Sequence, residues 1–253
     1  SLVSFENYAE NFAIDGAQGW ALGATADSNT GRVSSDPAAL EALEIYVLDG
    51  GTLPLDTTHE KVLKLAGPVA QSVEGVPGDT IQTYFMLLPV RRETPPALDD
   101  TTQVGLVFSS NGVATVFHHD ADTTNNVWIT LTNAPVLLTQ TWVRVSFLQD
   151  YTENAYQLSI DGGAPINDSR GWDTPGGAHP GSWFLMPGTN GVMSQISFDD
   201  DGDAYVDDLV IGGSLALAIT GSANVSSENG FLLGSLDWAG FSDTAVVVYW
   251  GPS

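Results

Sequence analysis

Two acidic segments near opposite ends of the chain carry the residue types best suited to hold a metal ion. The first includes Ser4-Phe5-Glu6-Asn7, and the second, Asp203–Ile211, includes the pair Asp207-Asp208. Both stretches have strand character, although most of the sequence separates them. If they pair as neighbouring strands, their carboxylates converge into an oxygen-rich site. Such a site suits a hard cation such as Ca²⁺, and it would tie the first strand of the fold to one of its last.

A second candidate cation site is the acidic loop that precedes this strand, Asp199-Asp200-Asp201-Gly202-Asp203. Calcium loops alternate their carboxylates so that every second side chain faces one ion, which makes Asp199, Asp201 and Asp203 the candidate ligands. Gly202 is the fourth residue of the loop and no Glu stands at the twelfth position, so the loop is not an EF-hand. The alternative is a solvated turn.

A third candidate site is the long Gly/Pro-rich segment 168–183, which combines aromatic and polar side chains. Its candidate ligand-binding residues are Arg170, Trp172, His179 and Trp183. Proteins hold sugars by stacking aromatic rings on them while polar groups reach the hydroxyls, and long loops in compact domains are often functional. The alternative is that both tryptophans pack against the edge of the sandwich.

No set of residues predicts catalysis, so we expect no catalytic residues and a protein that is not an enzyme. A glycosidase needs two carboxylates at a set separation, and acidic residues here are too common to single out a pair. A basic cleft for acidic sugars is unexpected because the chain has 7 Lys+Arg. His118 and His119 are adjacent, and adjacent strand residues face opposite sides of a sheet, so we expect a strand end running into a polar loop.

The composition limits the partners and the compartment. The 253 residues include 31 Asp+Glu against 7 Lys+Arg, a net charge of −24, which repels nucleic-acid phosphates. The same charge fits solubility, and cation binding at a few sites is compatible with it. There is no cysteine for a disulfide or a thiolate metal site. No apolar run approaches the roughly 20 residues that span a bilayer. From the type of domain described below, we expect an exported protein, secreted or at the cell surface.

Hydrophobic residues alternate, or form short runs bounded by Gly, Pro, Asn and Asp, which is typical of strands. The predicted fold class is therefore all-β. One segment, Asp36–Leu43, predicts a short helix that serves as a connector, with Asp36 as its N-cap and Pro37 as its first residue. The clear strand candidates are Ile81–Val90, Val104–Ser109, Val113–His118, Val127–Leu131, Trp142–Gln149, Tyr156–Ile160, Val192–Phe198 and Ala204–Ile211.

The segments Thr141–Phe147 and Tyr156–Gly163 resemble the central hairpin of laminin-G-like, concanavalin A-like jelly-roll domains. In that hairpin a Trp opens one strand, and an aromatic-x-Leu-x-Ile-Asp-Gly strand and turn follows. The terminal acidic segments are similar to those of jelly-roll carbohydrate-binding modules that contain calcium. The resemblance covers about residues 1–212 and implies an antiparallel β-sandwich (jelly roll) with a structural Ca²⁺. Its implied ligands are Glu6 and Asp207, with Asp208 next.

The organisation changes at Gly212-Gly213-Ser214, so we expect a sandwich over 1–212 and a β-strand extension over 213–253. The extension holds the strand-like runs Leu215–Thr220, Gly230–Leu236 and Ala245–Trp250. The last segment, Ala245–Pro252, resembles strands of fibronectin type III-like repeats. Three strands without disulfides or metal are too few for a core of their own, so we expect the extension to pack on the sandwich or on a neighbouring subunit.

Two hypotheses for function follow. The first is a non-catalytic structural or adhesive protein, a fibre or surface-layer subunit that self-associates through its C-terminal strands. Sheet-edge hydrogen bonds would supply affinity, and the apolar run Ala245–Trp250 would be an aggregation hazard if uncovered. The second is a calcium-stabilised carbohydrate-binding module for an extracellular polysaccharide. A polysaccharide-degrading enzyme has the least support of the three.

Overall fold

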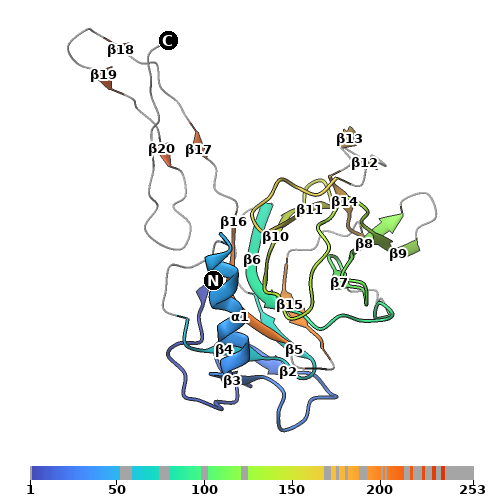
Figure 1. Ribbon diagram of the computed structural model, residues 1–253. Coiled ribbons are helices and arrows are strands. Elements are labelled where there is room, and N and C mark those ends of the chain that lie inside the picture. The colour runs from blue at the N-terminus through green and yellow to red at the C-terminus, as the bar shows by residue number, and fades with distance from the viewer. Residues whose placement is uncertain are drawn as a thin grey trace.

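The computed structural model is an all-β antiparallel sandwich, with one helix among the residues that it describes (Figure 1). The predicted fold class, an antiparallel β-sandwich of jelly-roll type, is confirmed. The structure describes 2–51, 59–73, 80–97, 102–120, 125–167, 172–174, 177–179, 182–187, 193–200, 202 and 204–213, followed by four short strands. None of its described helices is long and apolar enough to cross a membrane.

The largest sheet has eight strands and brings distant parts of the chain together. Along the sheet the order is β14-β11-β10-β6-β16-β4-β3, and β1 pairs with β16. The strands of this sheet are β1 (Leu2–Val3), β3 (Arg32–Ser34), β4 (Val62–Lys64), β6 (Thr80–Leu88), β10 (Val143–Asp150), β11 (Ala155–Ile160), β14 (Phe184–Leu185) and β16 (Tyr205–Gly213). The predicted hairpin is β10 with β11, in the register Val145↔Ile160 to Asp150↔Ala155.

Two three-stranded sheets, in the orders β15-β5-β2 and β7-β8-β9, and one small hairpin, β12-β13, complete this part of the fold. Their strands are β2 (Trp20–Leu22), β5 (Val69–Ser72), β7 (Leu106–Phe108), β8 (Ala114–Asp120), β9 (Asn125–Thr130), β12 (Trp172–Thr174), β13 (Gly177–His179) and β15 (Gln195–Phe198). The main core joins residues of the large sheet to both three-stranded sheets. Phe85 of β6, for example, meets Phe198 of β15 edge-on with ring centroids 5.1 Å apart.

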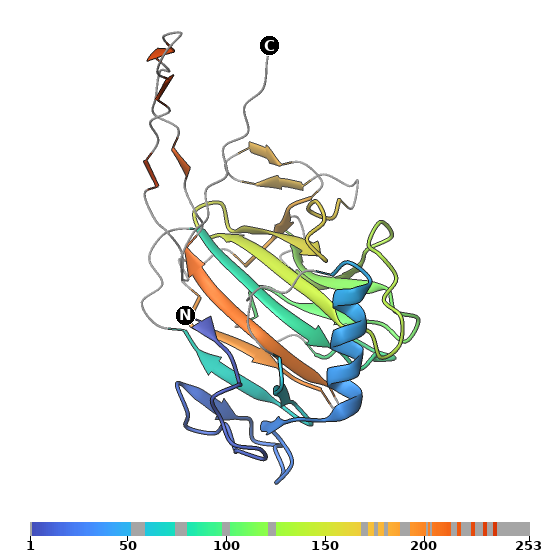
Figure 2. The ribbon, with the colours of Figure 1, turned by 60° about the vertical axis from the view of Figure 1, so that its left-hand side comes forward.

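Helix α1 (Pro37–Leu48) is longer than the sequence predicted and does more than connect strands. It has 12 residues and lies against the outer face of the large sheet (Figure 2). A second apolar cluster forms there, in which Leu43 and Tyr46 of the helix are buried with Met86 and Trp142. This packing stabilises the helix beyond Leu43, where the sequence expectation ended.

Asp36 caps α1 as predicted, since its Oδ1 accepts hydrogen bonds from the Ala38 and Ala39 amides at 2.9 and 3.1 Å. Its Oδ2 accepts from the Tyr205 hydroxyl at 3.1 Å. Burial acts to raise the pKa of Asp36, but the amide and hydroxyl donors outweigh it, and the pKa lies below its usual value. The cap therefore stabilises the fold above the unfolded-state pKa, and this contribution is lost as the pH falls through the folded-state pKa.

We expect Asp36→Ala to lower the free energy of unfolding at neutral pH by about 0.5–2 kcal/mol, because two helix amides lose their acceptor. Urea unfolding measures this loss, and the gap between variant and parent should narrow at acid pH. Glu41→Ala is the matched control, since Glu41 is exposed on the same helix and its removal should change the free energy by less than about 0.5 kcal/mol. An equal loss in both variants would contradict the capping role.

Beyond Gly213 the described strands pair with one another. β17 (Leu217–Ala218) pairs with β20 (Ser235–Leu236), and β18 (Asn224–Val225) pairs with β19 (Gly230–Phe231). The second pair lies between the members of the first in the sequence, so the two pairs are nested, and each forms a separate two-stranded sheet. Two of the three predicted C-terminal runs therefore contain strands, and the third, Ala245–Trp250, lies outside the described residues. Packing of this extension on the sandwich or on a neighbour stays a prediction.

Candidate metal centre

The N-terminal strand does pair with the late acidic strand, but through Leu2 and Val3, whereas Phe5–Asn7, which includes Glu6, forms a bend and turn after it. β1 runs antiparallel to β16 in the register Leu2↔Val210 and Val3↔Leu209. β6 lies along β16 as well, and β4 pairs with the start of β16 through Tyr205 and Val206. The acidic pair on β16 therefore lies near both the N-terminus and the chain that leads into β4.

A β-bulge shapes β16 at the acidic pair. The register with β6 shifts between Asp207 and Val210, and Asp208 has a φ of 51°. Asp tolerates this left-handed region better than most residues because its short polar side chain can bond locally. The Asp208 amide donates to Asp207 Oδ1 at 2.9 Å. In a regular strand consecutive side chains face opposite sides of the sheet, whereas here both carboxylates approach one imidazole.

That imidazole belongs to His59, which the sequence analysis did not single out. His59 Nδ1 lies 2.8 Å from Asp207 Oδ2, and His59 Nε2 lies 3.7 Å from Asp208 Oδ2. The side chains of Asp207 and Asp208 are 1% and 0% exposed, and that of His59 is 11% exposed. One ligand atom from each residue falls within 4.8 Å of the other two. The three residues form a buried group that could hold a metal ion.

Glu6 supports this group from outside it. Its Oε1 accepts hydrogen bonds from the backbone amides of Glu60 and Lys61, at 2.9 and 3.1 Å. Lys61 Nζ in turn donates to the carbonyl oxygens of Glu6 and Tyr8. The Glu6 carboxylate, predicted to be a metal ligand, instead fixes the backbone next to His59, and it is not a member of the His/Asp/Asp group.

The electrostatics of the centre follow from its burial. Burial raises the pKa of Asp207, and this effect is opposed by the hydrogen bond and the charge of His59 and by the Asp208 amide. Two carboxylates removed from water in one place need a cation or a proton between them. The imidazole nitrogen and two carboxylates are ligands that several divalent metals accept. They are a poor fit for Ca²⁺, which takes roughly six to eight oxygen ligands.

The second predicted cation site is the acidic loop 199–203, and the structure describes only some of its residues. Asp199 is 54% exposed, with its Oδ1 3.8 Å from Arg92, and Asp201 and Asp203 lie outside the described residues. Asp200 is the buried member of the loop, and its carboxylate accepts from the amides of Val90 and Gly202. Among the described residues of this loop, no group of metal ligands forms.

The predicted sugar-binding segment is described only in part. The backbone register of β12 and β13 places Trp172 opposite His179. Trp183 is half-buried, and Arg170 lies outside the described residues. His118, on β8, is buried, and its Nδ1 accepts the Leu185 amide at 3.1 Å, whereas His119 pairs with Asn126. The two adjacent histidines have separate partners, as expected of a strand end.

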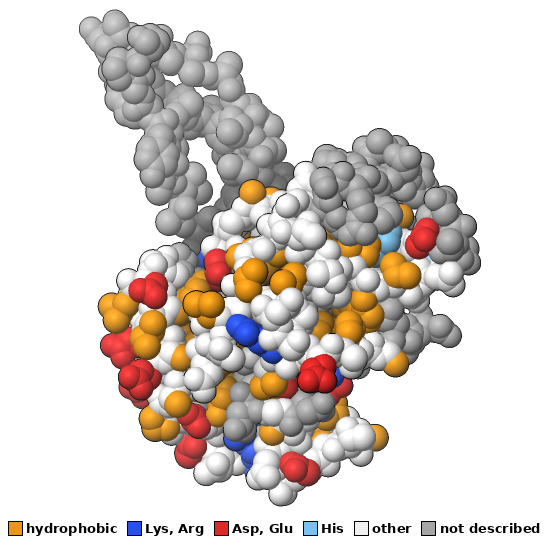
Figure 3. All heavy atoms as spheres, turned by 45° about the vertical axis from the view of Figure 1, so that its right-hand side comes forward, with side chains coloured by type: hydrophobic (Ala, Val, Ile, Leu, Met, Phe, Trp, Pro, Cys, Tyr) orange, Lys and Arg blue, Asp and Glu red, His pale blue; other side chains and the backbone are white. Residues whose placement is uncertain are grey.

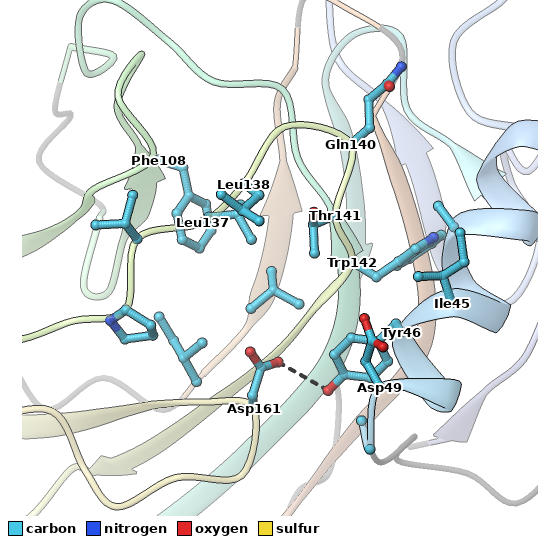
Figure 4. A pocket seen from close by; sticks show the side chains of 17 residues that line it. Ile45, Tyr46, Asp49, Phe108, Leu137, Leu138, Gln140, Thr141, Trp142 and Asp161 are labelled. Atoms are coloured by element: carbon cyan, nitrogen blue, oxygen red, sulfur yellow. Dashed lines mark hydrogen bonds between the residues drawn. The ribbon is translucent and has the colours of Figure 1, made fainter.

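A pocket of about 600 Å³ lies between the C-terminal half of α1 and the segment before β10 (Figure 4). The Tyr46 hydroxyl donates to Asp161 Oδ1 at 3.0 Å across one end of it. Asp161 and Gly162 both have positive φ, which agrees with the predicted tight turn. Trp142 lines the pocket but is 1% exposed, so it offers no open ring face for a sugar.

Comparisons with known proteins were made by sequence and by structure. No protein-family model matches the chain, and no curated protein matches it significantly. The solved structures that are similar to it include a sialidase, with 8% identity and a TM-score of 0.41 over 62% of this chain and 16% of the sialidase. The globular domain of T. cruzi calreticulin gives 14% identity and a TM-score of 0.42 over 81% of this chain and 87% of that domain.

A third similar structure is the catalytic domain of a glycoside hydrolase family 131 protein from Coprinopsis cinerea. It gives 13% identity and a TM-score of 0.39 over 83% of this chain and 92% of that domain. These neighbours include enzymes and proteins that are not described as enzymes. Similarities of this size concern the β-sandwich alone, and they carry no argument about a substrate, a partner or a reaction.

Proposed function

We propose that this protein is a non-catalytic structural or adhesive β-sandwich that works outside the cell and self-associates through residues 213–253. The observation that carries the proposal is the pairing of β17–β20 among themselves, after β16, an inner strand of the large sheet. A two-stranded hairpin alone is only marginally stable in water. Such a hairpin gains stability when it pairs with the edge of another sheet or when other residues cover its faces. The sheet or the covering residues can belong to the same chain or to a neighbouring copy.

The rest of the extension strengthens this reasoning. The run Ala245-Val246-Val247-Val248-Tyr249-Trp250, which resembles a fibronectin type III-like strand, has high β-propensity and no charge. An extended segment of this kind binds an exposed sheet edge through main-chain hydrogen bonds, while alternate side chains fill pockets and set the register. A second copy of the chain is the partner that this mode of binding implies.

The net negative charge of the chain opposes self-association, and it makes the association depend on salt concentration. The net charge is −24, and on the face drawn in Figure 3 acidic side chains are scattered over the surface, while basic ones appear at a few places. Two such surfaces repel each other at low ionic strength, and salt screens the repulsion. Apolar and main-chain contacts must therefore hold the copies together, and association should strengthen as salt is added.

Deletion of residues 214–253 tests the proposal. We expect the shortened chain to keep the circular dichroism of a folded sandwich and to sediment as a monomer, because the whole of β16 is retained. The full chain should sediment as larger species, increasingly so at higher salt. Val248→Asp in the full chain is the companion variant, since one carboxylate interrupts the apolar run without shortening it. Identical sedimentation of all three proteins would refute self-association through this segment.

The alternative function is a carbohydrate-binding module, favoured by the β12–β13 register that sets Trp172 opposite His179. Binding of the full chain to a glycan array, lost in Trp172→Ala and retained in Trp142→Phe, would support it. The sequence analysis assigned a structural Ca²⁺ to either function. The group of His59, Asp207 and Asp208 is compatible with the expected divalent cation between distant segments. The imidazole of His59 bears on which cation that is.

A further inference from the structure

We propose that His59, Asp207 and Asp208 bind a divalent transition metal of the zinc class rather than Ca²⁺. The proposal concerns a site and is independent of whether the protein self-associates. It starts from the imidazole, a nitrogen ligand beside two of the carboxylates that were expected to form an oxygen-rich site. Both of its nitrogens face a carboxylate, at 2.8 Å from Asp207 Oδ2 and 3.7 Å from Asp208 Oδ2.

The donor set matches the preferences of the ion. Zn²⁺ is bound by imidazole nitrogen and carboxylate oxygen at about 2.0–2.2 Å, and three protein ligands with water in the fourth position are a common arrangement. The three ligand atoms here lie within 4.8 Å of one another. Small side-chain movements bring them onto one ion. His59 is 11% exposed, which gives the ion and its water a path from solvent to the two buried aspartates.

Calcium fits the same residues poorly. It needs roughly six to eight oxygen ligands at about 2.3–2.6 Å, and the described centre offers two carboxylates and an imidazole. The third carboxylate expected there, that of Glu6, already accepts two backbone amides. Both amides bind Glu6 Oε1, and the group of ligand atoms that lie within 4.8 Å of one another does not include Glu6.

Charge balance also favours a divalent ion. A metal of charge +2 neutralises both buried carboxylates, while His59 binds as a neutral ligand and releases any proton that it carried. The ion would join β16 to the segment that precedes β4, and through the Glu6 contacts it would reach the N-terminal strand. Because these segments are far apart in the chain, the ion would bind the folded state selectively and stabilise it.

The experiment uses the full chain, stripped with chelator and then titrated with Zn²⁺, Co²⁺ or Ca²⁺ alone. At a hundredfold excess over its Kd, an ion that binds only the folded state raises the folding equilibrium constant about 100-fold, which should raise the Tm by roughly 5–10 °C. We expect this rise with Zn²⁺ and not with Ca²⁺. Co²⁺ should bind with one ion per chain and give visible absorption bands that report nitrogen coordination.

Variants separate this centre from other histidines. His59→Gln should abolish the Zn²⁺ shift and the Co²⁺ bands, and His119→Gln, on a half-buried histidine elsewhere, should keep both. Asp208→Asn is a second variant of the centre. The Co²⁺ spectrum of the unmodified chain tests metal binding without any substitution. The proposal is overturned if neither Zn²⁺ nor Co²⁺ binds the stripped chain. It is also overturned if Ca²⁺ gives an equal shift that survives His59→Gln.

Discussion

Replacing Asp207 with Ala should lower the free energy of unfolding by about 3–5 kcal/mol in the presence of chelator. The change removes the carboxylate that lies 2.8 Å from His59 Nδ1 in a largely buried site, and removing one partner of a buried ion pair is strongly destabilising. It also removes the acceptor of the Asp208 amide, at 2.9 Å. The result should appear in urea unfolding as a lower midpoint with an unchanged slope.

The matched control is Asp199→Ala. Asp199 is also an aspartate facing a cation, Arg92 at 3.8 Å, but its side chain is 54% exposed. Exposed ion pairs contribute about 0–1 kcal/mol, so this variant should unfold nearly as the parent does. If Asp207→Ala proves as mild as Asp199→Ala, the His59–Asp207 contact is not the buried pair described above.

A second large effect is expected from Trp142→Ala, which should cost about 3–5 kcal/mol of unfolding free energy. Trp142 is 1% exposed and stands between α1 and the large sheet, in one cluster with Leu43, Tyr46 and Met86. Its Nε1 donates to the Ala39 carbonyl at 2.8 Å. Truncation opens a cavity under the helix and leaves a buried carbonyl without this donor, so α1 should lose its attachment to the sheet.

Trp142→Phe separates the two contributions, because it keeps most of the packing and removes the indole donor. It should cost less than Trp142→Ala, with the remaining loss near the roughly 1–3 kcal/mol of an unsatisfied buried polar group. Leu138→Ala is the surface control beside the same pocket, since Leu138 is 70% exposed. Hydrogen exchange of the α1 amides would report the attachment, and unchanged protection in Trp142→Ala would contradict it.

The sequence predicted the architecture well because strands leave a local pattern. Alternation in β10 and β11 and the Asp161-Gly162 turn were each visible within a few residues. The pairing of β1 with β16 was predicted from the acidic segments that the two ends share, and the register Leu2↔Val210 confirms it. The helix was predicted at the right start but not at the right end. Ile45 and Val47 are β-branched, and the burial of Tyr46 against the sheet stabilises the last turns of the helix.

The centre could be predicted only in part, because its members meet through the sheet order. His59 and Asp207 are 148 residues apart, and no motif surrounds His59. Their proximity depends on β4 lying beside β16. The Asp-Asp pair did signal a site. In a regular strand the two side chains would face opposite sides of the sheet, and the bulge with Asp208 at positive φ removes that separation. Glu6 was predicted as a ligand from the resemblance, and in the structure its Oε1 accepts two backbone amides beside His59.

The most direct test of the self-association proposal is negative-stain electron microscopy of the full chain at moderate salt, where like-charge repulsion is screened. The account predicts filaments or regular arrays of sandwich-sized units. Evenly dispersed single particles, at concentrations well above those of the sedimentation experiments, would contradict it and favour a monomeric binding module.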